Sequence, residues 1–347
     1  RHGDVSVLRH VKEQASYPVS RRGALQLLGS VALLPVLGAV EGRDELRYAA
    51  GMAHWSGAAL GGSAEIRFSA DNEARALDLL ERAIRETNRL ERIFSLYRVD
   101  STLMRLNQQG SLLIPPPELL ELLSIVDLVH RLTDGVFDPT IQPLWRLYAE
   151  TGGKPDPEAL MAARNLVGWH RVRYDTQEVH LGPPGARLSL NGIAQGFITD
   201  RVTNLLLDEG VDSALVNLGE IRVIGHAPDG EPWSVGLADT ADGAAECRVQ
   251  LVDSAIATSA SAATTFDGTA SHILDPRNGM PATFRWRRVS VMHPSAAICD
   301  GIATAGVLLE ETALAAITRQ LPGTTVLALP RDGQLRSYPA KAHSQCR

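Results

Sequence analysis

Two short segments of the chain carry groups that could act on a phosphate. Asp300 and Thr304 lie four residues apart, so on a helix their carboxylate and hydroxyl would share one face. Residues 191–196 form a glycine-flanked loop that leads into a second expected helix, where backbone groups can face a ligand. Mg²⁺ prefers hard oxygen donors, takes few protein ligands and fills its other positions with phosphate oxygens and water. The two segments therefore indicate metal-assisted phosphoryl chemistry.

The composition is that of an ordinary globular protein. The chain has 347 residues, 44% hydrophobic and 21% charged, which allows one large domain or two of ordinary size. Its net charge is -6 at pH 7. A nucleic-acid or anionic membrane surface is therefore not expected to be its main partner.

The N-terminal segment differs from the rest of the chain. Arg21 and Arg22 precede a mostly apolar segment, residues 27–40, that glycine and proline interrupt. This pattern is typical of a Tat-type export signal, and it is shorter than the roughly 20 apolar residues of a membrane span. The alternative is an amphipathic helix with two solvated arginines. We predict an export signal and linker at residues 1–45, a folded domain at residues 46–347, and a periplasmic protein.

Apolar periodicity predicts both helices and strands. The expected helices cover residues 71–91, 117–133, 194–209 and 311–319. The expected strands cover residues 64–68, 214–217, 221–224, 233–237, 247–252 and 289–292, a pair around Val172 and Val179, and a hairpin of residues 324–329 and 335–338. The two types mix without the regular alternation of a doubly wound sheet. We predict an α+β fold with mixed or antiparallel sheets flanked by helices.

Standard nucleotide and hydrolase motifs are missing from the sequence. No GxGxxG motif follows an expected strand, and Gly152-Gly153-Lys154 is followed by Pro155 instead of the Ser or Thr of a P-loop. No GxSxG motif occurs either. A nucleotide site must therefore be built in another way.

Four further segments place polar or aromatic side chains at the ends of expected elements. They are residues 94–98, 137–140, 217–220 and 271–279, the last predicted as a strand that enters a tight turn. Each is weak evidence alone, because Asp-Pro usually starts a turn and a single histidine such as His272 is more often structural than catalytic. Together they indicate one composite site.

In their order along the chain, these segments resemble the ApbE-type FAD:protein FMN transferases. The resemblance covers residues 55–309. It rests on Leu60-Gly61-Gly62, Phe94-Ser95-x-Tyr97, Phe137-Asp138-Pro139-Thr140, Asn191-Gly192-Ile193-Ala194-x-Gly196, Ala257-Thr258-Ser259, His272-Ile273-x-Asp275-Pro276 and Asp300-x-x-x-Thr304. Parts of it are also similar to the periplasmic NosX branch, which serves nitrous oxide reductase assembly.

The resemblance implies a single ApbE-like domain, an activity and a set of site residues. FAD would bind with Mg²⁺ on its diphosphate, and FMN would move to a Thr or Ser hydroxyl of a partner protein with release of AMP. The metal ligands would be Asp300, Thr304 and the Ala194 carbonyl. The implied FAD-binding residues are Leu60, Ser95, Leu96, Tyr97, Asp138, Thr140, Asn191, Gly192, Gln195 and His272.

Two catalytic roles follow from this chemistry. Attack of an alcohol on a diphosphate needs charge neutralisation, which we assign to the metal site of Asp300. It also needs a base for the hydroxyl proton, and His272 is the candidate because an imidazole titrates near neutral pH.

The chain departs from the family pattern at several positions. Leu60 stands where methionine is usual, and Gln195 stands where lysine is common. The segment 217–220 is one residue shorter than the usual Asn-x-Gly-Gly-Asp. Loss of the lysine would remove a cation beside the diphosphate, with weaker FAD binding or slower transfer as the expected result.

Two other functions remain compatible with the sequence. One is a non-catalytic FAD-binding assembly factor or electron carrier. The other is a Mg²⁺-dependent FAD diphosphatase, in which water replaces the acceptor hydroxyl.

The acceptor is expected to be another protein. The segment of this chain nearest to an acceptor motif is residues 300–306, and Ala303 stands where the first hydroxyl is needed. We therefore predict action in trans on a flavoprotein, plausibly membrane-bound, that presents its Thr or Ser on the outer side of the cytoplasmic membrane.

Overall fold

The computed structural model describes most of the chain after its N-terminal segment. The described residues are 45–59, 61–238, 245–260, 265–266, 270–283, 285–331 and 333–339. The predicted export signal lies outside them, except for Glu45, which begins the first strand. Leu60 also lies outside the described residues.

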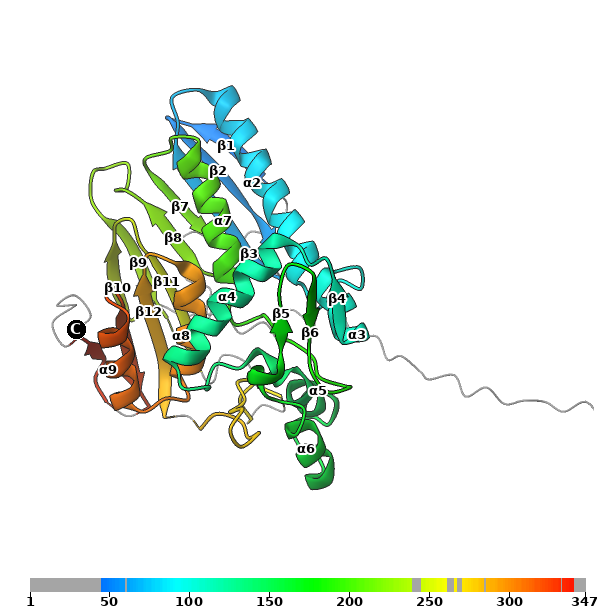
Figure 1. Ribbon diagram of the computed structural model, residues 1–347. Coiled ribbons are helices and arrows are strands. Elements are labelled where there is room, and N and C mark those ends of the chain that lie inside the picture. The colour runs from blue at the N-terminus through cyan, green and yellow to red at the C-terminus, as the bar shows by residue number, and fades with distance from the viewer. Residues whose placement is uncertain are drawn as a thin grey trace, which may run out of the picture.

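A nine-stranded sheet forms the centre of the molecule (Figure 1). Neighbouring strands are antiparallel throughout. The order is β1 (Glu45–Ala49), β2 (Met52–Ala59), β3 (Gly62–Ser69), β7 (Ala214–Asn217), β8 (Ile221–Ile224), β11 (Ala255–Ala260), β12 (Trp286–His293), β13 (Thr325–Pro330) and β14 (Arg336–Tyr338).

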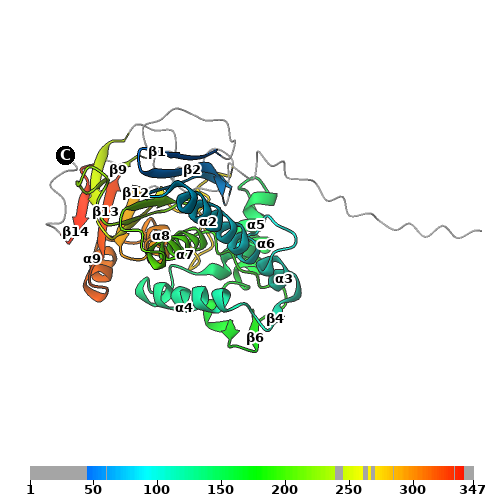
Figure 2. The same cartoon turned by 90° about the horizontal axis from the view of Figure 1, so that it is seen from above.

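Helices cover one face of this sheet in two layers. The inner layer is α2 (Glu73–Phe94), α7 (Ala194–Asp208) and α8 (Ala296–Gly306), and α4 (Pro117–Leu132) lies outside it, as the view from above shows (Figure 2). A further helix, α9 (Glu311–Gln320), packs near β13 and β14. None of the described helices is both long and apolar enough to cross a membrane.

A two-stranded hairpin, β9 (Trp233–Leu237) with β10 (Cys247–Leu251), covers part of the opposite face. Successive side chains of a strand point to opposite faces of the sheet. One strand can therefore contribute to a hydrophobic core under the helices and to another under the β9–β10 hairpin. In β7, Ala214 and Val216 join the helix-side core, and Leu215 joins the hairpin-side core. Burial on both faces explains why β7 is apolar over most of its length.

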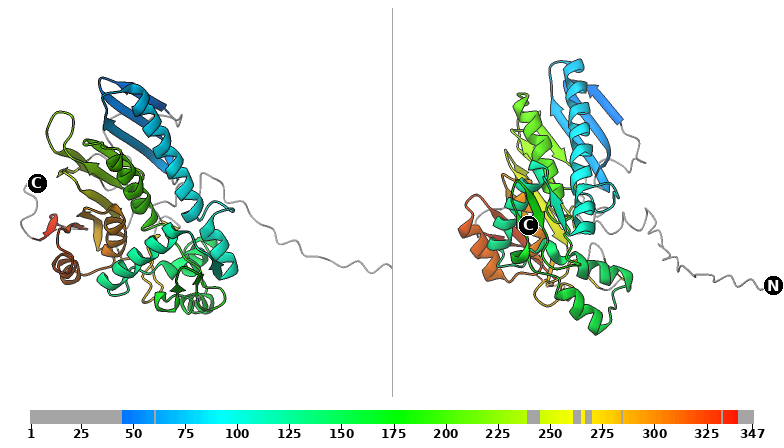
Figure 3. Two further views of the ribbon diagram at one scale, coloured as in Figure 1. Left: turned by 45° about the horizontal axis from the view of Figure 1, so that its top comes forward. Right: turned by 45° about the vertical axis from the view of Figure 1, so that its right-hand side comes forward.

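Smaller elements gather at one end of the molecule (Figure 3). They are α3 (Thr102–Gln109), α5 (Gln142–Glu150), α6 (Pro157–Arg164), the 3₁₀ helices η1 (Pro139–Ile141) and η2 (Trp169–Arg171), and a small sheet of β4 (Ser111–Leu113), β6 (Glu178–His180) and β5 (Arg173–Tyr174). Phe266 packs against α5, because its ring stacks on Tyr148 and meets Trp145 edge-on.

The predicted α+β class and single domain are confirmed. The expected helices correspond to α2, α4, α7 and α9, and the expected strands 214–217, 221–224 and 233–237 have the observed bounds. The prediction of a strand at residues 271–279 is wrong. Only isolated bridges occur there, at Ser271 and Leu274. The tight turn is present, since the Gly279 amide donates to the Asp275 carbonyl at 2.7 Å.

The backbones of α7 and α8 approach each other closely at Gly196. A Cβ on Gly196 would lie 2.2 Å from the Ala296 carbonyl oxygen and 2.7 Å from the Ala297 nitrogen. The two backbones therefore touch, and no side chain larger than hydrogen fits at position 196. This glycine is required for helix packing, because the crossing leaves no space for a methyl group.

We expect Gly196→Ala to destabilise the protein by about 3 kcal/mol or more, since one helix must move to admit the methyl group. Gly62→Ala is the matched control, because a Cβ there meets nothing within 4 Å. It should change stability by less than about 0.5 kcal/mol. Urea unfolding measures both, and equal midpoints for Gly196→Ala and wild type would contradict the close crossing.

Candidate active site

A cavity opens at the crossing of α7 and α8. Its empty space is about 960 Å³, including open solvent at the mouth. Part of its lining is apolar and aromatic, with Phe137, Ile141 and Trp145. Another part is polar. Its residues are Asn191, Gly192, Gln195, Glu220, Thr258, Ser259, Asp300 and Thr304.

Asp300 links α8 to the beginning of α7. One of its carboxylate oxygens, Oδ2, accepts a hydrogen bond from the Gly196 amide at 3.2 Å. The residue before α7, Ile193, supplies no side-chain cap, so the neighbouring helix provides the acceptor that the free amides need. One turn along α8, the Thr304 hydroxyl makes a long contact of 3.5 Å with the Gly192 carbonyl.

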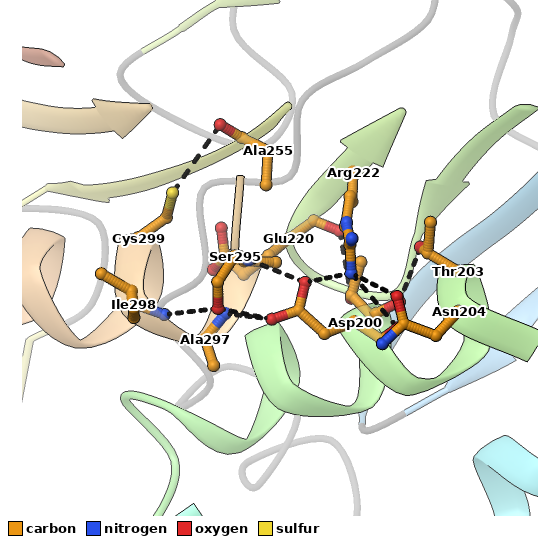
Figure 4. Close-up of polar contacts among 12 residues, drawn as sticks. Asp200, Thr203, Asn204, Glu220, Arg222, Ala255, Ser295, Ala297, Ile298 and Cys299 are labelled. Carbon is orange, nitrogen blue, oxygen red and sulfur yellow. Dashed lines mark hydrogen bonds and ion pairs between the residues drawn. The ribbon is translucent and has the colours of Figure 1, made fainter. Parts of the chain in front are cut away.

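Asp200 makes the reciprocal connection from α7 to the beginning of α8 (Figure 4). Its carboxylate accepts hydrogen bonds from the Ala296 amide at 2.8 Å, the Ala297 amide at 3.1 Å and the Ser295 hydroxyl at 2.7 Å. Arg222 pairs with the same carboxylate at 3.0 Å. Each helix therefore caps the other, and this exchange fixes where Asp300 lies.

Glu220 is the second acidic residue of the cavity. It is 4% exposed and lies in the turn between β7 and β8. Burial and the nearby charge of Asp300 raise the pKa of Glu220 well above its usual value, and a hydrogen bond from the Thr258 amide lowers it. Two acidic side chains thus share one buried end of the cavity.

Asp300 is equally buried, at 4% exposure. Burial raises the pKa of Asp300 to about 8, and the hydrogen bond from the Gly196 amide opposes this change. No cationic side chain of the described residues contributes to the pKa of Asp300 or Glu220. Among the described residues, no cationic side chain therefore offsets the negative charge of these two carboxyl groups.

His272 and Gln195 also line the cavity. Gln195 is 7% exposed and lies against the turn that carries Glu220, because a Cβ on Gly219 would be 2.7 Å from the Gln195 Nε2. His272 comes from the loop beside η1 and α5, next to the buried Ser271.

Asp138 lines the cavity, but its oxygens serve the local backbone. Oδ1 accepts from the Thr140 amide at 2.8 Å and the Thr140 hydroxyl at 2.5 Å, and Oδ2 accepts from the Trp169 amide at 3.0 Å. Thr140 itself is 1% exposed and is not among the lining residues. The pair shapes the wall of the cavity at η1.

The predicted FAD-binding segment 95–97 lies outside the lining of the cavity. The Ser95 hydroxyl accepts from the amides of Tyr97 at 3.0 Å and Arg98 at 3.2 Å, so it builds the turn after α2. Tyr97 alone reaches the site, through a 3.2 Å hydrogen bond that its hydroxyl accepts from the Asn191 side chain. Leu96 makes no lining contact.

The donors fit a cation that takes few protein ligands. Among the described residues, no group of three or more His, Cys, Asp and Glu side chains could hold a metal ion. Asp300, Thr304 and nearby backbone carbonyls offer hard oxygens, as Mg²⁺ requires when phosphate and water complete its shell. Ala194 begins α7 but does not line the cavity, and the carbonyl that contacts Thr304 belongs to Gly192.

Asp200 and Glu220 are the residues that sequence reasoning missed. Asp200 gives no local signal, because Thr199 and Arg201 on either side of it are polar as well. In the sequence, Glu220 stands out only as the last residue of the shortened segment 217–220. Its proximity to Asp300 depends on the path of β7, β8 and α8, which local patterns do not reveal.

Known proteins provide an independent comparison. The model of the ApbE family matches residues 60–328. An FAD:protein FMN transferase of Vibrio cholerae is 29% identical over 83% of this chain and 91% of its own length, and one of Treponema pallidum is 30% identical over 71% and 75%. The apo structure of the Pseudomonas stutzeri flavinyl transferase ApbE superposes with a TM-score of 0.71 at 26% identity, over 87% of this chain and 98% of that one. The chain therefore belongs to the ApbE family.

Proposed function

We propose that this protein transfers FMN from FAD to a Thr or Ser hydroxyl of a partner protein and releases AMP. The observation that carries the proposal is the polar end of the cavity, where Asp300, Thr304 and the beginning of α7 meet. The names of the similar proteins support FAD as donor and a protein as acceptor.

The aromatic part and the polar part of the cavity lining suit the flavin ring and the diphosphate of FAD, respectively. The aromatic and apolar wall of Phe137, Ile141 and Trp145 suits a flat ring system such as a flavin. The beginning of α7 suits a diphosphate, because a helix N-terminus attracts anions. We propose that Asp300 and Thr304, together with a backbone carbonyl of residues 192–194, hold Mg²⁺ on that diphosphate.

The reaction forms one phosphorus–oxygen bond and breaks another. The acceptor hydroxyl attacks the phosphorus on the FMN side, and the bond from that phosphorus to the bridging oxygen breaks, so AMP leaves. His272 takes the hydroxyl proton in this proposal. Bound Mg²⁺ would supply neutralisation of the diphosphate charge.

The acceptor and the location of the reaction extend this proposal. We place the protein in the periplasm, exported through its predicted twin-arginine signal, with an acceptor that is plausibly a membrane-bound flavoprotein. Electron supply to nitrous oxide reductase is the proposed context, which rests on similarity to the NosX branch.

One assay separates this proposal from the two alternatives. Purified protein is mixed with FAD, Mg²⁺ and an acceptor that contains a Thr or Ser flavinylation motif, and the acceptor is examined for in-gel flavin fluorescence. Transfer labels the acceptor, a diphosphatase yields free FMN, and a carrier or assembly factor yields neither product.

We expect Asp300→Ala to abolish labelling in that assay, because it removes a charged ligand proposed to hold Mg²⁺ on the diphosphate. A matched control is Asp78→Ala on α2, where the carboxylate is 62% exposed and lies far from the cavity lining. It should keep wild-type activity. Full labelling by Asp300→Ala in the presence of a chelator would exclude the metal assignment.

We expect His272→Ala to lower the transfer rate by about 10²–10⁴-fold with little change in FAD affinity, since a base acts in the transition state. Single-turnover transfer and a fluorescence titration of FAD measure the two quantities separately. If FAD affinity is lost instead, His272 is a binding residue and the base is another group.

A further inference from the structure

Glu220 occupies a turn that holds it firmly against α7. Within the turn, the Gly219 amide donates to the Asn217 side chain at 3.2 Å and the Leu218 amide donates to the Glu220 carbonyl at 3.2 Å. The Thr199 hydroxyl of α7 donates to the same Glu220 carbonyl at 3.3 Å. Gly219 has a φ of 107°, which a residue with a side chain rarely adopts. The backbone at Glu220 is therefore held in place, and the Glu220 carboxylate accepts a hydrogen bond from the Thr258 amide.

The Glu220 carboxylate lacks the charge partner that another buried glutamate has. Glu65 is 9% exposed, and its carboxylate pairs with Arg67 at 2.5 Å and with His54 at 2.9 Å. Glu220 is more deeply buried, receives one backbone hydrogen bond, and is repelled by the charge of Asp300. A buried carboxylate is unfavourable without a positive charge beside it, so this arrangement favours a bound cation.

Within the described part of the chain, the Asp300 carboxylate has one oxygen that is free to bind a cation. It is 4% exposed and lines the cavity. Its Oδ2 is used by the Gly196 amide, whereas no donor among the described residues contacts its Oδ1. A carboxylate oxygen on the cavity side, without a donor and beside a second carboxylate, is suited to a hard cation.

We propose that Glu220 supplies a second carboxylate to the divalent-cation site of Asp300 and Thr304, between α8 and the β7–β8 turn. This inference rests on the proposed function for the presence of a cation, and it deepens that proposal. Two carboxylates would balance the charge of a divalent ion before any diphosphate arrives. The cation should therefore bind the protein in the absence of FAD.

The test measures cation binding without FAD and without turnover. Mn²⁺ is titrated into the chelator-treated protein and free Mn²⁺ is followed by electron paramagnetic resonance, while the midpoint of thermal unfolding is measured with Mg²⁺ alone. Wild type should bind one Mn²⁺ and gain thermal stability with Mg²⁺. Glu220→Gln should bind Mn²⁺ at least tenfold more weakly, and in chelator it should be as stable as wild type or more stable.

Glu65→Gln is the matched control, because it also removes a buried glutamate charge. It should lower thermal stability by breaking the pairs with Arg67 and His54, and it should leave Mn²⁺ affinity unchanged. Glu220→Ala gives the same readout if Glu220→Gln does not fold, with the same expected loss of Mn²⁺ affinity.

The outcomes separate this inference from the proposed function. Equal Mn²⁺ affinity of wild type and either Glu220 variant would overturn the role of Glu220 alone. Binding of Mn²⁺ to wild type only when FAD is present would also overturn it and would leave the transferase proposal standing. If wild type binds no Mn²⁺ even in the presence of FAD, the proposed cation site does not exist, and the metal-dependent mechanism is contradicted as well.

Discussion

The backbone contact between α7 and α8 at Gly196 is the constraint on which the site depends. Because the two helices touch, the carboxylate of each reaches the free amides at the beginning of the other, Asp300 toward α7 and Asp200 toward α8. A larger residue at position 196 would separate both pairs together. The polar end of the cavity is thus a consequence of helix packing, and no mobile loop is needed to place Asp300.

The electrostatics of this end of the cavity explain what it can bind. Asp300 and Glu220 are buried, and the described residues offer them backbone amides but no cationic side chain. Such an arrangement costs stability in the free protein, and perturbed carboxylates in a cavity are typical of functional sites. The lining of the same cavity also contains the apolar and aromatic side chains of Phe137, Ile141 and Trp145. A ligand that suits this cavity has a flat ring for the aromatic lining and an anionic group, with a metal ion bound to it, for the two carboxyl groups.

Local patterns in the sequence predicted much of the fold and part of the site. Helical periodicity found α2, α4, α7 and α9, and the i, i+4 spacing of Asp300 and Thr304 correctly placed both on one helix next to residues 191–196. The short helix α6 was missed although Asp156 caps it and Pro157 occupies its first position, a readable start signal.

The remaining features depend on contacts between distant segments. Glu220 meets Asp300 only because β8 pairs with β11 and α8 packs on β11. Ser95 belongs to a family motif, yet its hydroxyl is used in the turn after α2, which only the hydrogen bonds reveal. The export signal, the periplasmic location and the branch of the family remain predictions from the sequence.

The central claim is that a divalent cation binds at the α7–α8 crossing beside the FAD diphosphate. Anomalous diffraction from crystals grown with Mn²⁺ and FAD tests it most directly. The account predicts one peak about 2.1 Å from oxygens of Asp300 and Thr304, with the diphosphate on its other side. FAD bound in the cavity with no peak beside Asp300, or with the peak elsewhere, would contradict it.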